Sequence, residues 1–217
     1  KCDQEVYASM DIDGKSLYCK LSTKEGHIFL HCFRVSGSNL SKSAKTVSYE
    51  QVQRWLPEVR DLVFLDLAIL GEVKGRVTIR LRQDLPSYAK NIPLLFTGEK
   101  GHSLADIPCV QCSTNNLGFA VSSVTEQINY FQRDSNAGNN ATQGAMLADC
   151  FSQKFCYIYI YHEKYATSYG SNYEVFGQVE TGLETVKLCK NHGNQNEVTV
   201  ADCGLVIKEN YFKRFET

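Results

Sequence analysis

The chain has 217 residues, of which 43% are hydrophobic and 22% are charged, and its formal net charge is −1 at pH 7. This composition is ordinary for a globular protein. There is no basic stripe and no run of like charges, which argues against generic nucleic-acid binding by electrostatics. The longest apolar runs, such as residues 62–70, are interrupted by charge and too short to span a bilayer. We therefore expect neither a nucleic-acid partner nor a membrane partner.

Nine cysteines are spread over the chain. An odd number with this spread does not resemble a disulfide framework, and free thiols are typical of reducing compartments. We therefore predict unpaired cysteines and a location in the cytoplasm or the nucleus. No residue pattern indicates a bound cofactor or a metal ion.

Residues 1–60 are predicted to form a small β-rich extension. Strands are expected at residues 6–12, 17–21 and 27–35. The first two flank Asp13-Gly14, a dipeptide that is typical of hairpin turns.

The extension is expected to end in a linker and a helix. Residues 36–45 are rich in Ser, Gly and Lys, which indicates a loop. Ser48 and Gln51 have the spacing of a capping box, so a helix is expected over residues 48–56, before Pro57.

From residue 62 the pattern predicts a second, larger β-rich region. Residues 63–70 form an apolar strand, and residues 75–82 alternate strictly between apolar and polar side chains, as in a half-buried antiparallel strand. A helix is expected near residues 86–95, irregular at Pro93, because an internal proline removes a hydrogen bond.

The remaining chain predicts more strands and one more helix. Residues 113–145 are expected to be mostly loops with one or two short strands. Further strands are expected at residues 154–161, 173–179 and 197–207, with a helix near residues 182–190. Many strands with two helices favour a closed antiparallel barrel.

Four motifs in this region occur in the order found in one known family. They are Val63-Phe64-Leu65-Asp66-Leu67-Ala68 with the glycines that follow, Leu95-Phe96-Thr97-Gly98-Glu99-Lys100-Gly101, Val175-Phe176-Gly177-Gln178-Val179, and Val200-Ala201-Asp202-Cys203-Gly204. The stretch that holds them resembles a cyclophilin, a peptidyl-prolyl cis/trans isomerase. The resemblance covers roughly two thirds of the chain. It implies an eight-stranded antiparallel barrel capped by two helices at residues 61–210, followed by a tail at 211–217.

The resemblance also implies where the catalytic arginine of the family would stand. Isomerisation of an X–Pro bond needs a hydrogen-bond donor near the imide nitrogen, where it favours the twisted state. In cyclophilins an arginine within a Phe-His-Arg segment supplies that donor. The matching residues here are Val110, Gln111 and Cys112. Because a thiol is a weak donor without a fixed charge, we predict that the chain is not an enzyme.

The rest of the family groove matches only in part. By resemblance, Gln153, Phe155, Phe119 and Tyr173 are the candidate vestigial groove residues. A second alignment would instead match Asn136-Ala137-Gly138 to the Asn-Ala-Gly motif that precedes the groove strand. The groove tryptophan has no equivalent, and Tyr165 or Tyr169 are candidates for its place. We therefore expect no binding of cyclosporin-type macrocycles.

Two other features have competing interpretations. Cys109-Val110-Gln111-Cys112 is a CxxC sequence, which suits half a zinc site, a redox pair or two buried thiols on a strand. The tyrosines at 157, 159 and 161 suit either a ligand-stacking surface or barrel packing. For both features we favour the packing interpretation.

The predicted function is a catalytically inactive, cyclophilin-like interaction module within a larger protein, which binds a peptide or a partner domain. The rival hypothesis is a residual isomerase with a displaced arginine such as Arg133. A metal or redox domain built on Cys109 and Cys112 is the third hypothesis.

Overall fold

The structure is a computed structural model, which describes residues 5–35, 40–41, 43–122, 129–131, 142–149, 155–164, 173–192 and 194–208. The fold is mainly β, as predicted. The strands are β1 (Val6–Ile12), β2 (Lys15–Lys24), β3 (His27–His31), β4 (Arg34–Val35), β5 (Lys45–Ser48), β6 (Leu62–Ile69), β7 (Glu72–Leu81), β8 (Cys109–Cys112), β9 (Asn116–Ser122), β10 (Ala145–Asp149), β11 (Phe155–Tyr161), β12 (Tyr173–Thr181) and β13 (Val198–Lys208). The helices are α1 (Tyr49–Gln53), α2 (Pro86–Thr97) and α3 (Leu183–His192), and a short 3-10 turn, η2 (Gln195–Glu197), precedes β13.

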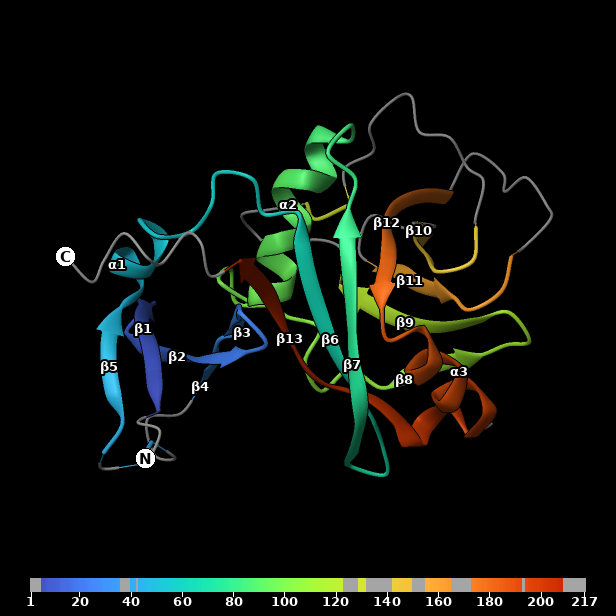
Figure 1. Cartoon of the computed structure of the whole chain (residues 1–217), viewed down its shortest axis with the longest axis horizontal. Coiled ribbons are helices and arrows are strands. Elements are labelled where there is room, and N and C mark those ends of the chain that lie inside the picture. The colour runs from blue at the N-terminus through green and yellow to red at the C-terminus, as the bar shows by residue number, and fades with distance from the viewer. Residues whose placement is uncertain are drawn as a thin grey trace.

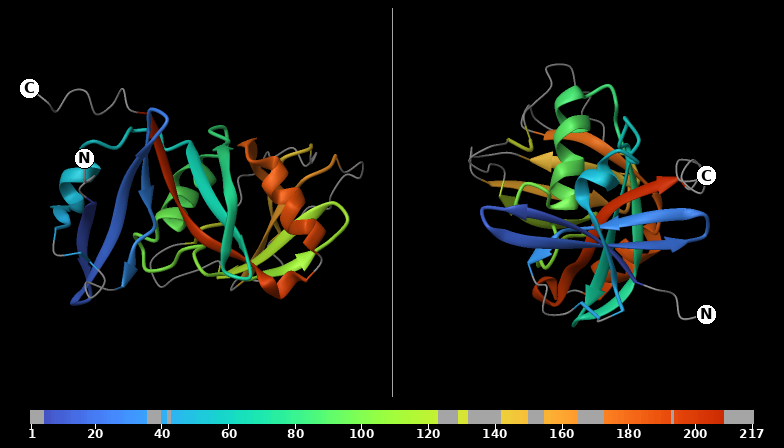
Figure 2. Two further views of the ribbon diagram at one scale, coloured as in Figure 1. Left: turned by 60° about the horizontal axis from the view of Figure 1, so that its bottom comes forward. Right: turned by 90° about the vertical axis from the view of Figure 1, so that its left-hand side faces the viewer.

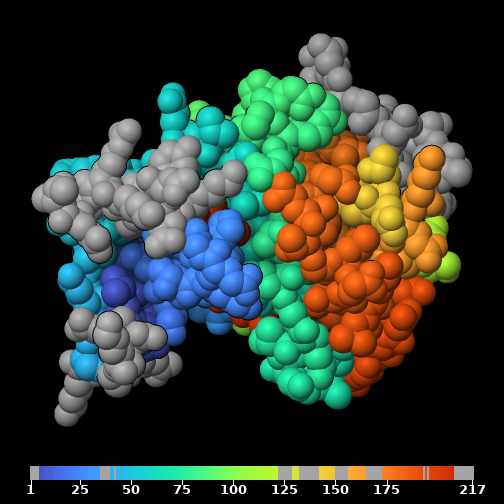
Figure 3. Space-filling model, viewed as in Figure 1, coloured from blue at the N-terminus to red at the C-terminus, as the bar shows by residue number. Residues whose placement is uncertain are grey.

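All of these strands belong to one large sheet. Hydrogen-bonded neighbours follow the order β5-β1-β2-β3-β13-β6-β7-β12-β10-β11-β9-β8, and β4 pairs with β2. The β1–β5 pair is parallel, so the sheet is mixed. Figure 1 shows β5 and β1 at one end of the long axis and β8, β9 and α3 toward the other. In the space-filling view, β6 and β7 separate the blue extension from the orange atoms of β12 and α3 (Figure 3).

The sheet is open, which corrects the expectation of a closed eight-stranded barrel. Eight strands from β13 to β8 are consecutive, but within the described residues the two end strands meet only at an isolated bridge between Pro108 and Thr199. Two backbone hydrogen bonds flank this bridge, from Val200 N to Ile107 O (3.0 Å) and from Asp106 N to Val200 O (2.7 Å). Pro108 has no N–H to donate, and Asp106 has a left-handed φ of 64°. The segment before β8 therefore cannot continue as a regular strand along β13.

The N-terminal extension is part of the same sheet and the same core. Strand β3 pairs with β13, with Leu30 opposite Leu205. Buried side chains of the extension, among them Cys19 and Leu30, belong to one continuous cluster with Leu65 and Leu205. The right-hand view of Figure 2 looks onto β1 and β2, which lie across the near end of the molecule.

Alternation along the strands decides which side chains enter this core. On β7, Val77, Ile79 and Leu81 are buried and the residues between them are half-buried, as the sequence pattern predicts. Helix α2 packs on β13 and β6. It continues through the buried Pro93 as far as Thr97, and Gly98 ends it with a φ of 71°. The helix is therefore longer than expected.

Local elements of the extension differ from the prediction in two places. The expected strand at residues 27–35 is divided into β3 and β4, and the expected linker gives way to β5 at Lys45. The capping box of Ser48 and Gln51 is confirmed, but α1 ends at Gln53. After Gln53 the chain tightens into a turn at residues 54–55, in which Trp55 N bonds to Val52 O (2.8 Å), three residues back instead of four.

One cysteine contradicts the expectation of unpaired thiols. Six cysteines among the described residues are free: Cys19, Cys32, Cys109, Cys112, Cys189 and Cys203. Cys156 is disulfide-bonded. An odd number of cysteines guarantees one unpaired thiol but does not exclude a bridge, so the count alone could not predict this pairing.

Candidate functional site

The residues that the resemblance matches to a catalytic segment, Val110, Gln111 and Cys112, lie on β8. The β8–β9 register shifts between Cys109 and Gln111, where β8 has an irregularity. As a result Gln111 is exposed, Val110 is half-buried, and the half-buried Cys112 packs against the main core. The Sγ atom of Cys112 lies 3.6 Å from the Sγ of the buried Cys109. The Cys112 side chain is therefore directed toward the core.

The other predicted groove residues are dispersed. Phe119, on β9, is 2% exposed within the main core, so it cannot contact a ligand at the surface. Phe155 begins β11 opposite Ser122, and its side chain lies outside the described residues. Gln153 lies outside them too, as do Arg133, Tyr165, Tyr169 and residues 136–138 of the second alignment. Tyr173 is half-buried at the start of β12.

Gln111 and Tyr173 share the wall of one polar hollow, which we call the tyrosine hollow. Its volume is about 350 Å³, and its lining residues are Gln111, Ser113, Thr114, Asn115, Asn116, Tyr159, Tyr161 and Tyr173. The structure thus brings two of the predicted site residues together. Tyr159 and Tyr161 had been interpreted as barrel packing, and the structure places them beside a ligand-sized space as well.

Strand alternation places the tyrosines in the hollow. On β11, Cys156, Ile158 and Ile160 enter the main core, so Tyr159 and Tyr161 point to the opposite face. Gly118 lies opposite Tyr159 on β9. A Cβ added at Gly118 would lie 2.7 Å from the Tyr159 ring, so the glycine makes room for the aromatic side chain.

The turn between β8 and β9 supplies the polar wall of the tyrosine hollow. The Ser113 hydroxyl accepts hydrogen bonds from the backbone N–H groups of Asn115 (3.3 Å) and Asn116 (3.2 Å). The Asn115 carbonyl accepts one from His162 N (3.0 Å), which ties the turn to the end of β11. The side chain of Asn116 is 7% exposed, and its Oδ1 has no hydrogen-bond partner.

A buried carboxylate lies behind the tyrosines. Asp149, on β10, is 1% exposed, and its Oδ1 also lacks a partner. Burial raises the pKa of Asp149 to about 6, although a hydrogen bond with Tyr173 acts in the opposite direction. Burial also raises the pKa of Tyr159, and the nearby Asp149 charge adds to that effect. The two buried oxygens of Asn116 and Asp149 are thus acceptors without donors.

A second and larger hollow lies between the extension and the 98–102 loop. Its volume is about 920 Å³, and its lining residues are Ser9, Met10, Asp11, Ile12, Asp13, Ser48, Tyr49, Glu50, Gln53, Glu99, Lys100, Gly101 and His102. The buried Glu99 accepts hydrogen bonds from the Tyr49 hydroxyl (2.5 Å) and from Arg60 (3.0 Å). Both acceptor oxygens of Glu99 are therefore used to join the extension to the 98–102 loop.

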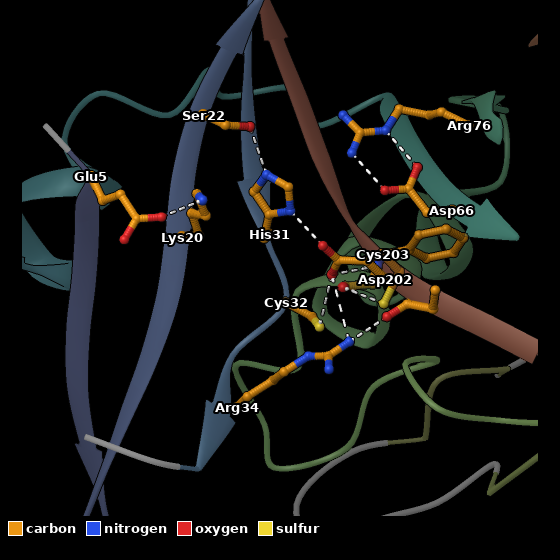
Figure 4. A network of polar contacts seen from close by, with 12 residues as sticks. Glu5, Lys20, Ser22, His31, Cys32, Arg34, Asp66, Arg76, Asp202 and Cys203 are labelled. Atoms are coloured by element: carbon orange, nitrogen blue, oxygen red, sulfur yellow. Dashed lines mark hydrogen bonds and ion pairs between the residues drawn. The ribbon is translucent and has the colours of Figure 1, made fainter. Parts of the chain in front are cut away.

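A network of polar contacts joins β2, β3 and β13 on the outer face of the sheet (Figure 4). Ser22 Oγ lies 2.7 Å from His31 Nε2, and His31 Nδ1 lies 2.5 Å from Asp202 Oδ2. Because an ionised Asp202 can only accept, Nδ1 carries the proton. Arg34 bonds to the Ala201 carbonyl at 2.5 Å. These contacts fix β3 against β13.

Arg76 stabilises the adjacent part of this face, where it joins β7 to β6. Arg76, on β7, makes two bonds of 2.7 Å to the carboxylate of Asp66 on β6. Its guanidinium carbon also lies 4.3 Å from the ring centroid of Phe29 and 4.0 Å from that of Phe64. Such stacked, bidentate arginines are rigid. This pair belongs to the scaffold rather than to a hollow.

The described residues contain no group of three or more His, Cys, Asp or Glu side chains placed to hold a metal ion. Among them there is also no helix long and apolar enough to cross a membrane. Comparison with models of known protein families finds none that matches the chain.

Proposed function

We propose that the chain is a catalytically inactive, cyclophilin-like interaction module that binds a peptide segment of a partner protein in the tyrosine hollow. The observation that carries the proposal is the meeting of Gln111 and Tyr173 in one hollow, while Cys112 turns to the core. The resemblance assigns all three positions to the ancestral groove. A binding surface is thus retained without the group on which the chemistry depends.

Several features support a cyclophilin-like ancestry. Eight consecutive strands run from β13 through β6, β7, β12, β10, β11 and β9 to β8, and their two ends meet at the Pro108–Thr199 bridge. Helices α2 and α3 begin within one residue of the predicted positions. An open sheet with this strand order, whose two ends meet at one isolated bridge, is the form of the family fold that we propose here.

The lining of the tyrosine hollow supports binding rather than isomerisation. The described residues that line it carry no charged side chain. Removal of one preorganised donor from an active site costs about 10²–10³ in rate. The rival hypothesis, a displaced Arg133, concerns a residue outside the described ranges. Without the groove tryptophan and arginine, cyclosporin-type macrocycles are not expected to bind.

We also propose that the protein is located in the cytoplasm or the nucleus. The six free cysteines favour a reducing compartment, whereas the disulfide at Cys156 favours an oxidising one. Thiol counting by mass spectrometry on protein from the native source distinguishes the two. A fully reduced Cys156 would support the intracellular setting, and a stoichiometric disulfide would contradict it.

Selection from a display library of random peptides tests the function. We expect the unmodified protein to enrich a family of related peptides, and Gln111→Ala to weaken their binding roughly tenfold, by the loss of polar contacts. Gln53→Ala is the matched control, because Gln53 is an exposed glutamine in the larger hollow. If no peptide is enriched, or if Gln53→Ala weakens binding and Gln111→Ala does not, the proposed site is wrong.

A further inference from the structure

The tyrosine hollow combines aromatic side chains with an asparagine whose buried oxygen has no hydrogen-bond donor. Tyr159, Tyr161 and Tyr173 line it, as does Asn116, whose buried Oδ1 lacks a partner. We propose that this hollow binds a cationic side chain, a lysine or an arginine, of the partner peptide. The inference rests on the proposed function and specifies the chemistry of the ligand.

The first argument is the balance of donors and acceptors. A buried oxygen without a hydrogen bond is unfavourable, and few such atoms occur in native proteins. Asn116 is 7% exposed and lines the hollow, and Asp149 is 1% exposed behind it. A ligand that brings several N–H donors supplies the missing bond once the Asn116 side chain turns its buried Oδ1 into the hollow. Ammonium and guanidinium groups carry three and five such donors.

The second argument is the sign of the local field. The Asp149 carboxylate is hydrogen-bonded with Tyr173 and acts on Tyr159, so it lies next to two of the lining tyrosines. Aromatic faces attract cations through their quadrupole. The described lining residues include no lysine, arginine or histidine that would repel a cation. The same field disfavours a phosphate or a carboxylate ligand.

The third argument is size. The Tyr157 and Tyr159 rings stack at 6.1 Å with an interplanar angle of 22°, so the aromatic surface extends along β11 beyond the hollow itself. A volume of about 350 Å³ exceeds that of an ammonium group alone. It accommodates the apolar stem of lysine or arginine against the tyrosine rings, with the charged end beside Asn116. A side chain of a peptide fits this arrangement better than a small free cation.

NMR titration with blocked amino acids tests the inference. The probes are the N-acetyl methylamides of lysine, arginine, norleucine and glutamate, of which norleucine keeps the stem of lysine without its charge. We expect lysine or arginine to shift the amide signals of residues 111–116 and 159–161, with norleucine and glutamate at least about tenfold weaker. If norleucine binds equally well, or if the shifts lie elsewhere, the inference is wrong.

A matched pair of variants tests whether the Asp149 carboxylate is the charge that attracts the cationic side chain. Asp149→Asn keeps the shape of the side chain and removes the carboxylate, and should weaken lysine binding roughly tenfold. Asp13→Asn removes a carboxylate at the exposed β1–β2 turn, where asparagine readily adopts the left-handed φ of 49°, and should change nothing. Equal affinity of both variants would contradict the assignment of Asp149.

The peptide selection separates this inference from the function on which it rests. Enriched peptides that share a lysine or arginine, whose replacement by norleucine abolishes binding, support both. Enriched peptides that depend on Gln111 but contain no shared basic residue overturn the cationic assignment and leave the binding function intact. A selection that enriches no peptide overturns the binding function. This measurement uses the unmodified protein and does not depend on the folding of any variant of Asp149.

Discussion

The Sγ atoms of Cys109 and Cys112 lie 3.6 Å apart, at the junction of β8 with the main core. Burial raises the pKa of the Cys109 thiol to about 12, and the neighbouring Cys112 adds to that effect. A thiol with such a pKa is protonated at neutral pH and is a poor nucleophile and a poor metal ligand. The contact favours the packing interpretation of the CxxC sequence.

Arginine at position 112 should not restore isomerase activity. We expect no acceleration of X–Pro isomerisation by the unmodified protein or by Cys112→Arg in a protease-coupled peptide assay. The variant should lose about 1–3 kcal/mol of stability, because a guanidinium would replace a side chain that packs against the core. Gln111→Arg is the control, since Gln111 is exposed on the same strand. Activity well above background in either the unmodified protein or Cys112→Arg would support the enzyme hypothesis.

Asp149 should make the fold less stable as the pH rises. Its pKa is about 6 in the folded protein, against an ordinary value of 3.8. Between pH 4 and 6 the folded state therefore binds more protons than the unfolded state, and the free energy of unfolding falls with rising pH. Asp149→Asn should abolish this component and stabilise the protein at pH 7 by about 1–2 kcal/mol.

Urea unfolding at several pH values measures the effect of Asp149. The difference between Asp149→Asn and the unmodified protein isolates this group from the other carboxylates. Asp13→Asn, at the exposed β1–β2 turn, is the control variant measured alongside. A difference that stays constant between pH 4 and 7 would show that Asp149 is not the titrating group.

Asp202 should make the fold less stable as the pH falls, which is the opposite of the effect of Asp149. Burial alone would raise its pKa, but hydrogen bonds from His31 and the Cys203 N–H outweigh burial, so the pKa is lowered. The stability that these bonds contribute is present above the ordinary pKa of about 4 and is lost as the pH falls further. Asp202→Asn should cost about 2–3 kcal/mol at pH 7. Thermal unfolding at pH 7 measures this loss, and the control is Asp84→Asn, which breaks an exposed ion pair with Arg82. The control should cost less than about 1 kcal/mol.

Gly204 should tolerate no side chain. A Cβ there would lie 2.0 Å from the backbone oxygen of Leu30 and 2.8 Å from the Phe64 ring. Gly204→Ala should therefore destabilise the protein by about 3 kcal/mol and expose the amides of β3 to hydrogen exchange. At Gly75 an added Cβ would meet only side-chain atoms of Thr185, which can rotate. Equal losses for Gly204→Ala and Gly75→Ala would contradict the importance of the β3–β13 contact.

Local patterns predicted most of the regular elements. The strict alternation of Val77, Ile79 and Leu81 places β7 correctly, and the capping box of Ser48 and Gln51 marks the start of α1. Strand β5 escaped prediction because its partner β1 is almost forty residues away, and the polar Lys45–Ser48 segment has no pattern of its own. The open edge of the sheet was not predicted either, because it is decided by a single isolated bridge between Pro108 and Thr199, which lie far apart in the sequence.

The tyrosine hollow was predictable only in part. Resemblance singled out Gln111 and Tyr173, which share it, but also Phe119, which alternation along β9 places inside the core. On β11 both faces are apolar or aromatic, so periodicity could not decide which face looks outward. The contribution of Asn116 depends on the turn held by Ser113, and no residue pattern indicates that its oxygen lacks a donor.

The pairing of β3 with β13 has a consequence for any shortened version of the protein. In the intact chain, β13 has neighbours on both sides, β3 and β6. A fragment that began after the extension would present the backbone of residues 204–208 as a bare edge strand, next to the apolar side chains of Leu205, Val206 and Ile207. Such an edge is a template for strand addition by another molecule. In the chain described here, β3 of the extension covers this edge.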